Sequence, residues 1–221
     1  MIELIAKTVA AYLLGGVMGG DVIGRLTGGI DLRKSGSGNV GATNALRSKG
    51  KVFALGVLLI DIGKGVAAAL LIPMLPWPST QADVISPDVS GFACGFAAAL
   101  GHCYPLFAGF KGGKGVSTLT GVFGALLPAA LPWMFAGFVL VLMLTGYVSL
   151  SSLTGAVAAT FWVTCVSPFG AWSAAGAFST AMLLLIVFKH RQNLRRVVAG
   201  SEGRFERARV LGKWIDQWRV R

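Results

Sequence analysis

Charged residues are scarce in this sequence. Only 13% of its 221 residues are Asp, Glu, Lys or Arg, against roughly 25% in an average soluble domain. Hydrophobic residues make up 54%, and the mean hydropathy is +0.70. A soluble domain of this length has too little interior to bury so much apolar surface. The composition therefore excludes a disordered chain, argues against an ordinary cytosolic enzyme and predicts an integral membrane protein.

Cysteine and histidine are also rare. Cys94, Cys103 and Cys165 lie in apolar segments outside any CxxC pattern, so they are predicted to be packing residues. HExxH and GxSxG are missing, and neither His102 nor His190 begins an HxxxxD box. No metal site and no cofactor are predicted. The first 20 residues lack a signal-peptide pattern.

Long apolar runs predict an all-α protein with about seven transmembrane helices, some of them short. The predicted spans are Ile2–Ile23, Val52–Leu75, Gly91–Ala108, and about 116–131, 132–148, 153–167 and 173–188. A five-span alternative joins 116–148 into one helix kinked at Pro128 and Pro132. Such a helix overshoots the hydrocarbon core, which favours seven spans.

The basic residues gather in three segments. The Arg25–Lys51 loop carries a net +5, Lys111 and Lys114 mark a second loop, and the chain from Lys189 onward carries +7. The loop 76–90 contains no Lys or Arg. Because cytoplasmic loops are rich in Lys and Arg, the N-terminus is predicted to be periplasmic and the C-terminus cytoplasmic. Charge patterned in this way indicates contact with anionic lipids and no nucleic-acid partner.

The first basic loop is rich in glycine and small polar residues. Ser37, Gly38, Asn39, Thr43 and Asn44 lie within ten residues. The glycines match GxGxxG, but no strand precedes them, which argues against a dinucleotide fold. Glycine-rich backbone can turn successive N–H groups toward one anion. The loop is therefore predicted to cradle phosphate, together with the planar guanidinium of Arg47. A flexible loop whose charge only sets the topology is the alternative.

The second basic loop reads Lys111-Gly112-Gly113-Lys114. It departs from a Walker A loop because Ala108 stands at the leading Gly position and Gly115 at the Ser/Thr position. Two lysines on glycine hinges before a predicted helix still favour a second anion site. Lysines that only set the topology are the alternative.

Two further pairs of polar residues have helical spacing. His190 and Asn193 are three residues apart and share a helix face at the predicted membrane boundary. Such a histidine serves as a general base, a phosphate donor or a plain interfacial hydrogen-bonding group. Asp61 and Lys64 lie within an apolar span and are predicted to form an i,i+3 ion pair.

The C-terminal residues differ in kind from the rest. Residues 204–221 place apolar side chains at helical spacing among arginines and lysine. They are predicted to form a basic amphipathic helix in the lipid headgroup layer, with a solvated helical tail as the alternative. Residues 1–203 are predicted to form a single transmembrane domain.

The loop motifs together resemble those of the bacterial acyl-phosphate:glycerol-3-phosphate acyltransferases, the PlsY family. The matching segments read GSGNVGATNALR, LIDIGKG, GHCYPLFAGFKGGKGVST, YVSLSS and HRQNLRRVVAGSE. The resemblance implies a seven-helix enzyme of the bacterial inner membrane whose active site faces the cytoplasm. Such enzymes transfer a fatty acyl group from acyl phosphate to the 1-hydroxyl of glycerol 3-phosphate, forming lysophosphatidic acid in the first step of phospholipid synthesis. They use no metal or nucleotide and depend on the acyltransferase that forms acyl phosphate.

This resemblance gives the candidate residues their expected roles. His190 is expected to orient or deprotonate the hydroxyl, with a substrate phosphate as the alternative base. Ser149 and Ser152 are expected to hydrogen-bond the phosphates or the reacting carbonyl. The expected substrate-binding residues are Ser37, Gly38, Asn39, Thr43, Asn44, Arg47, Lys111, Gly112, Gly113, Lys114, Asn193 and Glu202. One departure is the GGVMGG at 15–20, where the family usually has GSIPFG.

Two other functions fit part of the pattern. A transporter of an anionic phosphate metabolite would also use inward-facing basic loops, but it should show an inverted repeat around a midplane site. A Ser–His hydrolase using Ser149 and His190 would need an oxyanion motif that we do not recognise. The concentration of polar groups at one predicted face favours the acyltransferase.

Overall fold

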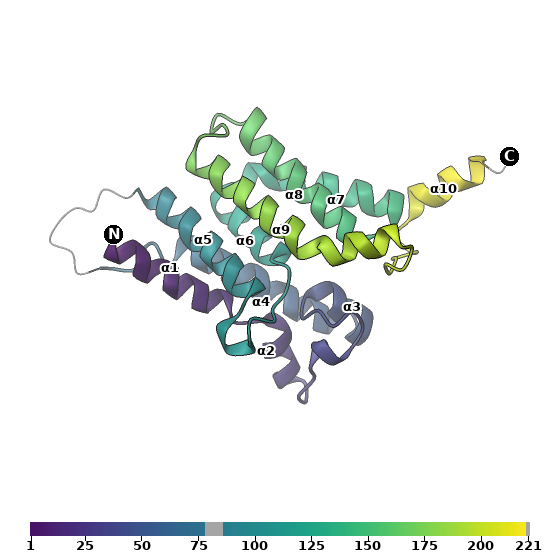
Figure 1. The fold of residues 1–221 in the computed structure, drawn as a ribbon, viewed down its shortest axis with the longest axis horizontal. Helices are drawn as coiled ribbons and strands as arrows, with labels where there is room; N and C mark the ends of the chain where they lie inside the picture. Colours follow the sequence, from purple (N-terminus) through teal and green to yellow (C-terminus); the bar gives the residue numbers. More distant parts are fainter. Residues whose placement is uncertain (78–85, 220–221) are drawn as a thin grey trace. The chain divides into compact units, whose positions relative to one another are not determined.

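The structure is a computed structural model that describes residues 1–77 and 86–219, and every regular element in those ranges is helical (Figure 1). The α-helices are α1 (Ile2–Gly15), α2 (Gly19–Leu26), α3 (Ala42–Lys49), α4 (Lys51–Leu70), α5 (Pro87–Cys103), α6 (Val116–Leu126), α7 (Leu131–Thr145), α8 (Val148–Phe161), α9 (Ala174–Val198) and α10 (Val210–Arg219). Short 3-10 turns lie at Leu32–Lys34, Leu106–Ala108 and Pro128–Ala130, and a π-helical turn lies at Trp162–Val166. The predicted all-α fold class is confirmed.

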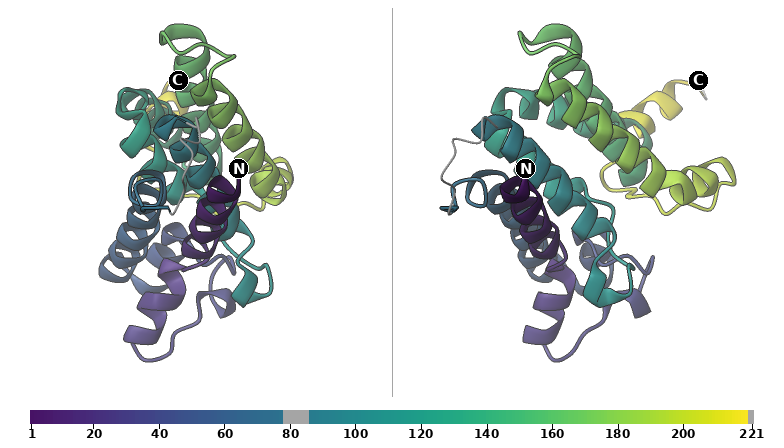
Figure 2. Two further views of the ribbon diagram at one scale, coloured as in Figure 1. Left: turned by 90° about the vertical axis from the view of Figure 1, so that its left-hand side faces the viewer. Right: turned by 60° about the vertical axis from the view of Figure 1, so that its left-hand side comes forward.

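The chain divides into two compact units, Met1–Pro128 and Ala129–Arg221. In the first unit, α1 packs along α5, and α4 contacts α2, α3, α5 and α6. In the second unit, α8 packs against both α7 and α9, and α10 contacts α7 (Figure 2). Residues 204–219 belong to the second unit, and the boundary at residue 203 between a transmembrane domain and a basic tail stays a prediction.

Four stretches are long and apolar enough to cross a membrane: Lys51–Leu70, Pro87–Ala108, Pro128–Thr145 and Val148–Val166. A fifth arises if α1 and α2, which are bent by 45°, form one broken span. α6 is apolar but only 11 residues long, and α9 carries a basic C-terminal part. The count of seven spans and the orientation of the termini therefore stay predictions. Residues 78–85 of the predicted periplasmic loop and residues 220–221 of the tail lie outside the described residues.

The predicted first span, Ile2–Ile23, is wrong as a continuous helix. It breaks between Gly15 and Gly19, where two glycines allow neighbouring backbone to approach closely. A Cβ on Gly15 would clash with the carbonyl oxygen of Ala98, and one on Gly19 would lie 2.5 Å from the carbonyl oxygen of Val57. The side chains of Asp61 and Lys64 bind backbone groups that the break frees.

The region around Ser149–Ser152 also differs from the prediction. We expected a return loop there, with a span at 153–167, but α8 already begins at Val148. Gly146 ends α7 in the left-handed conformation, at φ 73°. The hydroxyl of Ser152 then donates to the carbonyl oxygen of Val148 at 2.9 Å. Hydroxyls that bond to the preceding turn are compatible with a helix interior, so the polar run does not interrupt it.

Candidate functional site

The glycine-rich loop of the first unit is organised by Asn44. Its side-chain oxygen accepts the Ser37 N–H at 2.9 Å, and its amide nitrogen donates to the carbonyl oxygens of Leu32, Ser35 and Asn39 at 3.1, 2.9 and 2.8 Å. Asn44 is only 2% exposed. These backbone partners occupy its hydrogen-bonding groups, so Asn44 shapes the loop and is not placed to bind phosphate directly.

Positive φ angles explain the glycines of this loop. Gly36 and Gly38 have φ of 57° and 73°, in the left-handed region that favours glycine. A Cβ on Gly36 would also clash with the side chain of Asn44. Ser37 and Gly38 are exposed, and Thr43 is half-buried in the first turn of α3. The exposed Arg47 lies in the last turn of the same helix.

The lysine loop rests on His102 at the end of α5. The N–H of Gly113 donates to the His102 carbonyl oxygen at 3.0 Å. A Cβ on Gly112 would clash with that carbonyl, and one on Gly113 would clash with the imidazole. Glycine is therefore required at both positions for the backbone to pass over His102. Lys111 and Lys114 flank these two glycines and are held in place by their contact with His102.

Arg33 connects the two loops. Its guanidinium pairs with Asp21 at 2.6 Å, and two of its nitrogens donate to the Lys111 carbonyl oxygen at 3.4 and 3.3 Å. The glycine-rich loop and the lysine loop of the first unit are thus linked by an arginine that sequence reasoning counted only as a topology charge. No local sequence pattern indicates this role of Arg33, because its partners Asp21 and Lys111 lie 12 residues before it and 78 residues after it.

A buried ion pair lies beneath these loops. Lys64 pairs with Asp61 at 2.9 Å, as predicted, and both side chains are almost fully buried. Asp61 also accepts the Gly19 N–H at 3.1 Å and lies 3.5 Å from Nδ1 of His102. Lys64 donates to the Val17 carbonyl oxygen at 2.8 Å. The pair therefore joins the break between α1 and α2 to the histidine under the lysine loop.

In the second unit, three polar side chains converge on Glu202, and we call this group the Glu202 cluster. One oxygen of Glu202 accepts hydrogen bonds from Ser149 at 3.0 Å and from Asn193 at 2.7 Å. Its other oxygen accepts from Arg196 at 2.8 Å. α8 supplies the serine, α9 supplies Asn193 and Arg196, and the loop after α9 supplies the carboxylate.

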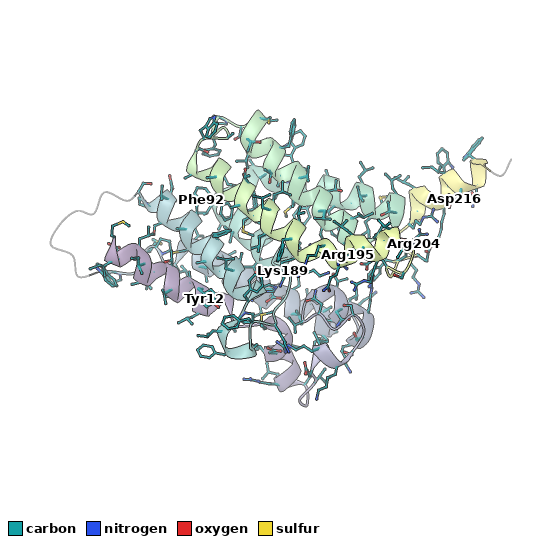
Figure 3. All side chains as sticks on the ribbon, in the orientation of Figure 1. Tyr12, Phe92, Lys189, Arg195, Arg204 and Asp216 are labelled. Carbon is teal, nitrogen blue, oxygen red and sulfur yellow. The ribbon has the colours of Figure 1, made fainter. Side chains whose placement is uncertain are left out.

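His190 lies one turn before Asn193 on the buried face of α9 and is 2% exposed. Its Nδ1 lies 2.9 Å from the Ile186 carbonyl oxygen. A carbonyl only accepts, so this bond assigns the proton of the neutral ring to Nδ1 and leaves Nε2 as the acceptor. That tautomer is the one a general base requires. Figure 3 labels Lys189 and Arg195, the basic residues of α9 that lie just before His190 and just after Asn193 in the sequence.

The predicted site residues thus fall into local groups. Ser149, Asn193 and Glu202 are in direct contact, while Ser152 lies one turn along α8 and bonds to its own helix. Sequence reasoning missed Arg33 and Arg196, which touch predicted site residues. Arg196 could have been noticed because it belongs to the HRQNLRR motif. Its hydrogen bond to Glu202 could not, because that contact depends on how the chain turns after α9. Among residues 1–77 and 86–219, no three His, Cys, Asp or Glu side chains form a group that could hold a metal ion.

The charge of Glu202 makes its cluster sensitive to acid. Burial raises the pKa of Glu202, but hydrogen bonds from Arg196, Asn193 and Ser149 outweigh burial and bring the pKa below the ordinary value of 4.5. Because the pKa is lower in the folded state, the cluster stabilises the protein above about pH 4.5 and this contribution is lost as the pH falls through the folded-state value.

We expect Glu202→Gln to lower the thermal unfolding midpoint at neutral pH, with the difference from wild type disappearing in acid. A difference that stays constant with pH would contradict this assignment.

The chain matches one family of known proteins over most of its length. Residues 5–200 match the family model described as glycerol-3-phosphate acyltransferase. The glycerol-3-phosphate acyltransferase of Shouchella clausii is 42% identical over 207 residues, covering 92% of this chain and 97% of that protein. The one from Zymomonas mobilis is 39% identical over 212 residues, again covering 92% and 97%.

Solved structures show the same likeness in three dimensions. The crystal structure of PlsY, an integral membrane glycerol 3-phosphate acyltransferase, in its glycerol 3-phosphate form has a TM-score of 0.79 at 35% identity. The match covers 94% of this chain and 98% of that one. The lysophosphatidic acid form has a TM-score of 0.78 at 34% identity. On this likeness over nearly its whole length, the chain belongs to the glycerol-3-phosphate acyltransferase family.

Proposed function

We propose that this glycerol-3-phosphate acyltransferase uses acyl phosphate as its donor and forms lysophosphatidic acid and inorganic phosphate. The buried His190 supports the proposed acyl transfer, because its side chain lies on the same face of α9 as Asn193 of the Glu202 cluster and its Nε2 is the acceptor nitrogen. The choice of acyl phosphate as donor rests on the resemblance of the loop motifs to those of the acyl-phosphate-dependent enzymes. The similar PlsY structures are described with glycerol 3-phosphate and with lysophosphatidic acid, which supports these as substrate and product.

The proposed reaction is a direct acyl transfer. The 1-hydroxyl oxygen of glycerol 3-phosphate attacks the acyl carbonyl carbon, an ester bond forms, and the bond from that carbon to the phosphate oxygen breaks. Nε2 of His190 takes the hydroxyl proton, with a substrate phosphate as the alternative base. Phosphate leaves with the electron pair of the broken bond. Since acyl phosphate is already activated, positioning and charge neutralisation supply most of the catalysis.

The remaining residues would bind the two substrates. Glu202 acts as a positioning residue that accepts from Asn193 and Ser149. The Asn193 amide carries a second hydrogen that would be donated to a substrate phosphate, whereas Ser149 has one hydroxyl hydrogen and would reach a phosphate or the reacting carbonyl by exchanging its bond to Glu202 for one to the substrate. Ser152 would hydrogen-bond a phosphate or the reacting carbonyl. In the first unit, Thr43, Arg47, Lys111 and Lys114 would bind phosphate, with Ser37, Gly38, Asn39, Gly112 and Gly113 supplying close backbone. Asn44 keeps the role of holding that backbone.

The proposal also covers the membrane location of the enzyme, its topology and the source of its acyl phosphate. The basic loops are proposed to face the cytoplasm from a bacterial inner membrane, with seven spans and a periplasmic N-terminus. Acyl phosphate would come from a separate acyltransferase that forms it. The transporter alternative loses its support, because the family to which the chain belongs consists of acyltransferases.

The choice of donor can be tested with purified protein in detergent. Palmitoyl phosphate and glycerol 3-phosphate are supplied without coenzyme A or carrier protein, and lysophosphatidic acid and inorganic phosphate are measured. We expect the two products in equal amounts. Lysophosphatidic acid formed from palmitoyl-CoA but not from palmitoyl phosphate would overturn the proposed donor and leave the family assignment intact.

A further inference from the structure

The C-terminal helix lies beyond the family match, which ends at residue 200. We predicted a helix from residue 204, but the structure begins α10 at Val210, because residues 201–209 form a strap across the end of α7. The N–H of Phe205 donates to the Gly146 carbonyl oxygen at 2.8 Å. The guanidinium of Arg204, which is labelled in Figure 3, lies 4.6 Å from the ring centre of Tyr147.

α10 itself is fixed at the same place. Gly212 is buried, and a Cβ there would clash with the carbonyl oxygen of Leu144 in the last turn of α7. α7 belongs to a stretch long and apolar enough to span a membrane. The strap and this glycine contact hold α10 at the end of α7, which would place α10 at the depth of the lipid headgroups where that span ends.

One face of α10 is apolar and uncovered within the chain. Val210, Trp214 and Trp218 are 57, 58 and 62% exposed, and the two indole rings stack edge to face with centres 5.7 Å apart. Lys213 is exposed and lies beside this face, three residues after Val210 and one before Trp214, and Arg209 pairs with Asp216 at 2.6 Å. Residues 204–221 contain six Lys or Arg and two acidic residues. Exposed tryptophans next to cationic side chains are typical of a helix that lies in the headgroup layer of an anionic bilayer.

We propose that α10 is an in-plane membrane anchor that inserts its tryptophan face into the bilayer interface and binds anionic lipid headgroups through its basic residues. The surface it recognises is the bilayer that the protein spans, and this role is independent of the acyl donor. Glu202 itself lies in the strap, three residues before Phe205, whose N–H donates to the Gly146 carbonyl oxygen.

The anchor can be tested by tryptophan quenching in the full-length protein. Wild type and the Trp214→Phe/Trp218→Phe variant are reconstituted in vesicles of phosphatidylcholine alone or of equal parts phosphatidylcholine and phosphatidylglycerol. Each preparation is made with and without a lipid that carries a nitroxide near its headgroup. The difference between the two proteins isolates the emission of two of the six tryptophans. The matched control is Trp172→Phe, because Trp172 is fully exposed in a loop outside α10.

We expect the emission of Trp214 and Trp218 to be quenched more strongly in the anionic vesicles. High salt, or Arg207→Glu with Lys213→Glu, should remove that difference, since each cation lost near an anionic surface weakens binding about five-fold. Equal quenching in the two vesicles, or quenching by aqueous iodide instead of by the lipid, would overturn the anchor. Acyltransferase activity of these variants in detergent should match wild type, so failure of the anchor is distinguishable from failure of the proposed reaction.

Discussion

Replacing His190 by alanine is expected to lower kcat by about 10²–10⁴-fold, the range for loss of a general base. The imidazole is 2% exposed, and the Ile186 carbonyl oxygen 2.9 Å from Nδ1 makes Nε2 its acceptor nitrogen. Removing the ring removes the proton acceptor and keeps Ser149, Asn193 and Arg196, the three side chains that donate to Glu202. We therefore expect the KM for glycerol 3-phosphate to change little, as measured from initial rates with palmitoyl phosphate.

Two further variants separate a base from a group that only orients the hydroxyl. His190→Gln retains a polar side chain but cannot accept the proton, so it should be as slow as the alanine variant. If glutamine restores most of kcat, a substrate phosphate is the base and His190 only orients. Asn193→Ala is the matched control on the same helix face, and it should mainly raise the KM for glycerol 3-phosphate.

Asp61→Asn is expected to destabilise the protein by about 3–5 kcal/mol, because it leaves the buried ammonium of Lys64 without its counter-charge. Lys64 is 5% exposed and pairs with Asp61 at 2.9 Å. The measurement is the thermal unfolding midpoint in detergent. Since Asp61 also lies 3.5 Å from His102, which holds Gly113, the KM for glycerol 3-phosphate should rise as well.

A double variant tests the physical reason. Asp61→Leu with Lys64→Met removes both charges, so it should recover much of the stability lost in Asp61→Asn. It should stay below wild type, because the Val17 carbonyl and the Gly19 N–H lose their partners at the helix break. An Asp61→Asn protein that unfolds at the wild-type temperature would show that the ion pair contributes nothing to stability.

Local patterns predicted much of this protein. The Asp61–Lys64 pair depends on i,i+3 spacing within one helix, and the positive φ of Gly36 and Gly38 is a property of the loop itself. The prediction failed where a local pattern has two structural solutions. The polar run Ser149–Ser152 separates the predicted spans 132–148 and 153–167, yet the Ser152 hydroxyl finds its hydrogen-bond partner within α8. A short polar run alone does not distinguish these outcomes.

The membrane class, the helical fold and the family follow from the amino-acid sequence alone. The apolar content is a sum over residues and each family motif is contiguous, so none of these conclusions requires knowledge of which segments meet. The binding partners of the polar side chains, in contrast, depend on the tertiary structure. Ser149 and Glu202 are 53 residues apart, and their hydrogen bond exists because α8 packs against α9 and the chain turns back after α9. The two asparagines differ for the same reason. Asn44 makes its hydrogen bonds to the backbone of its own loop, whereas Asn193 donates to the Glu202 carboxylate, which lies outside its helix.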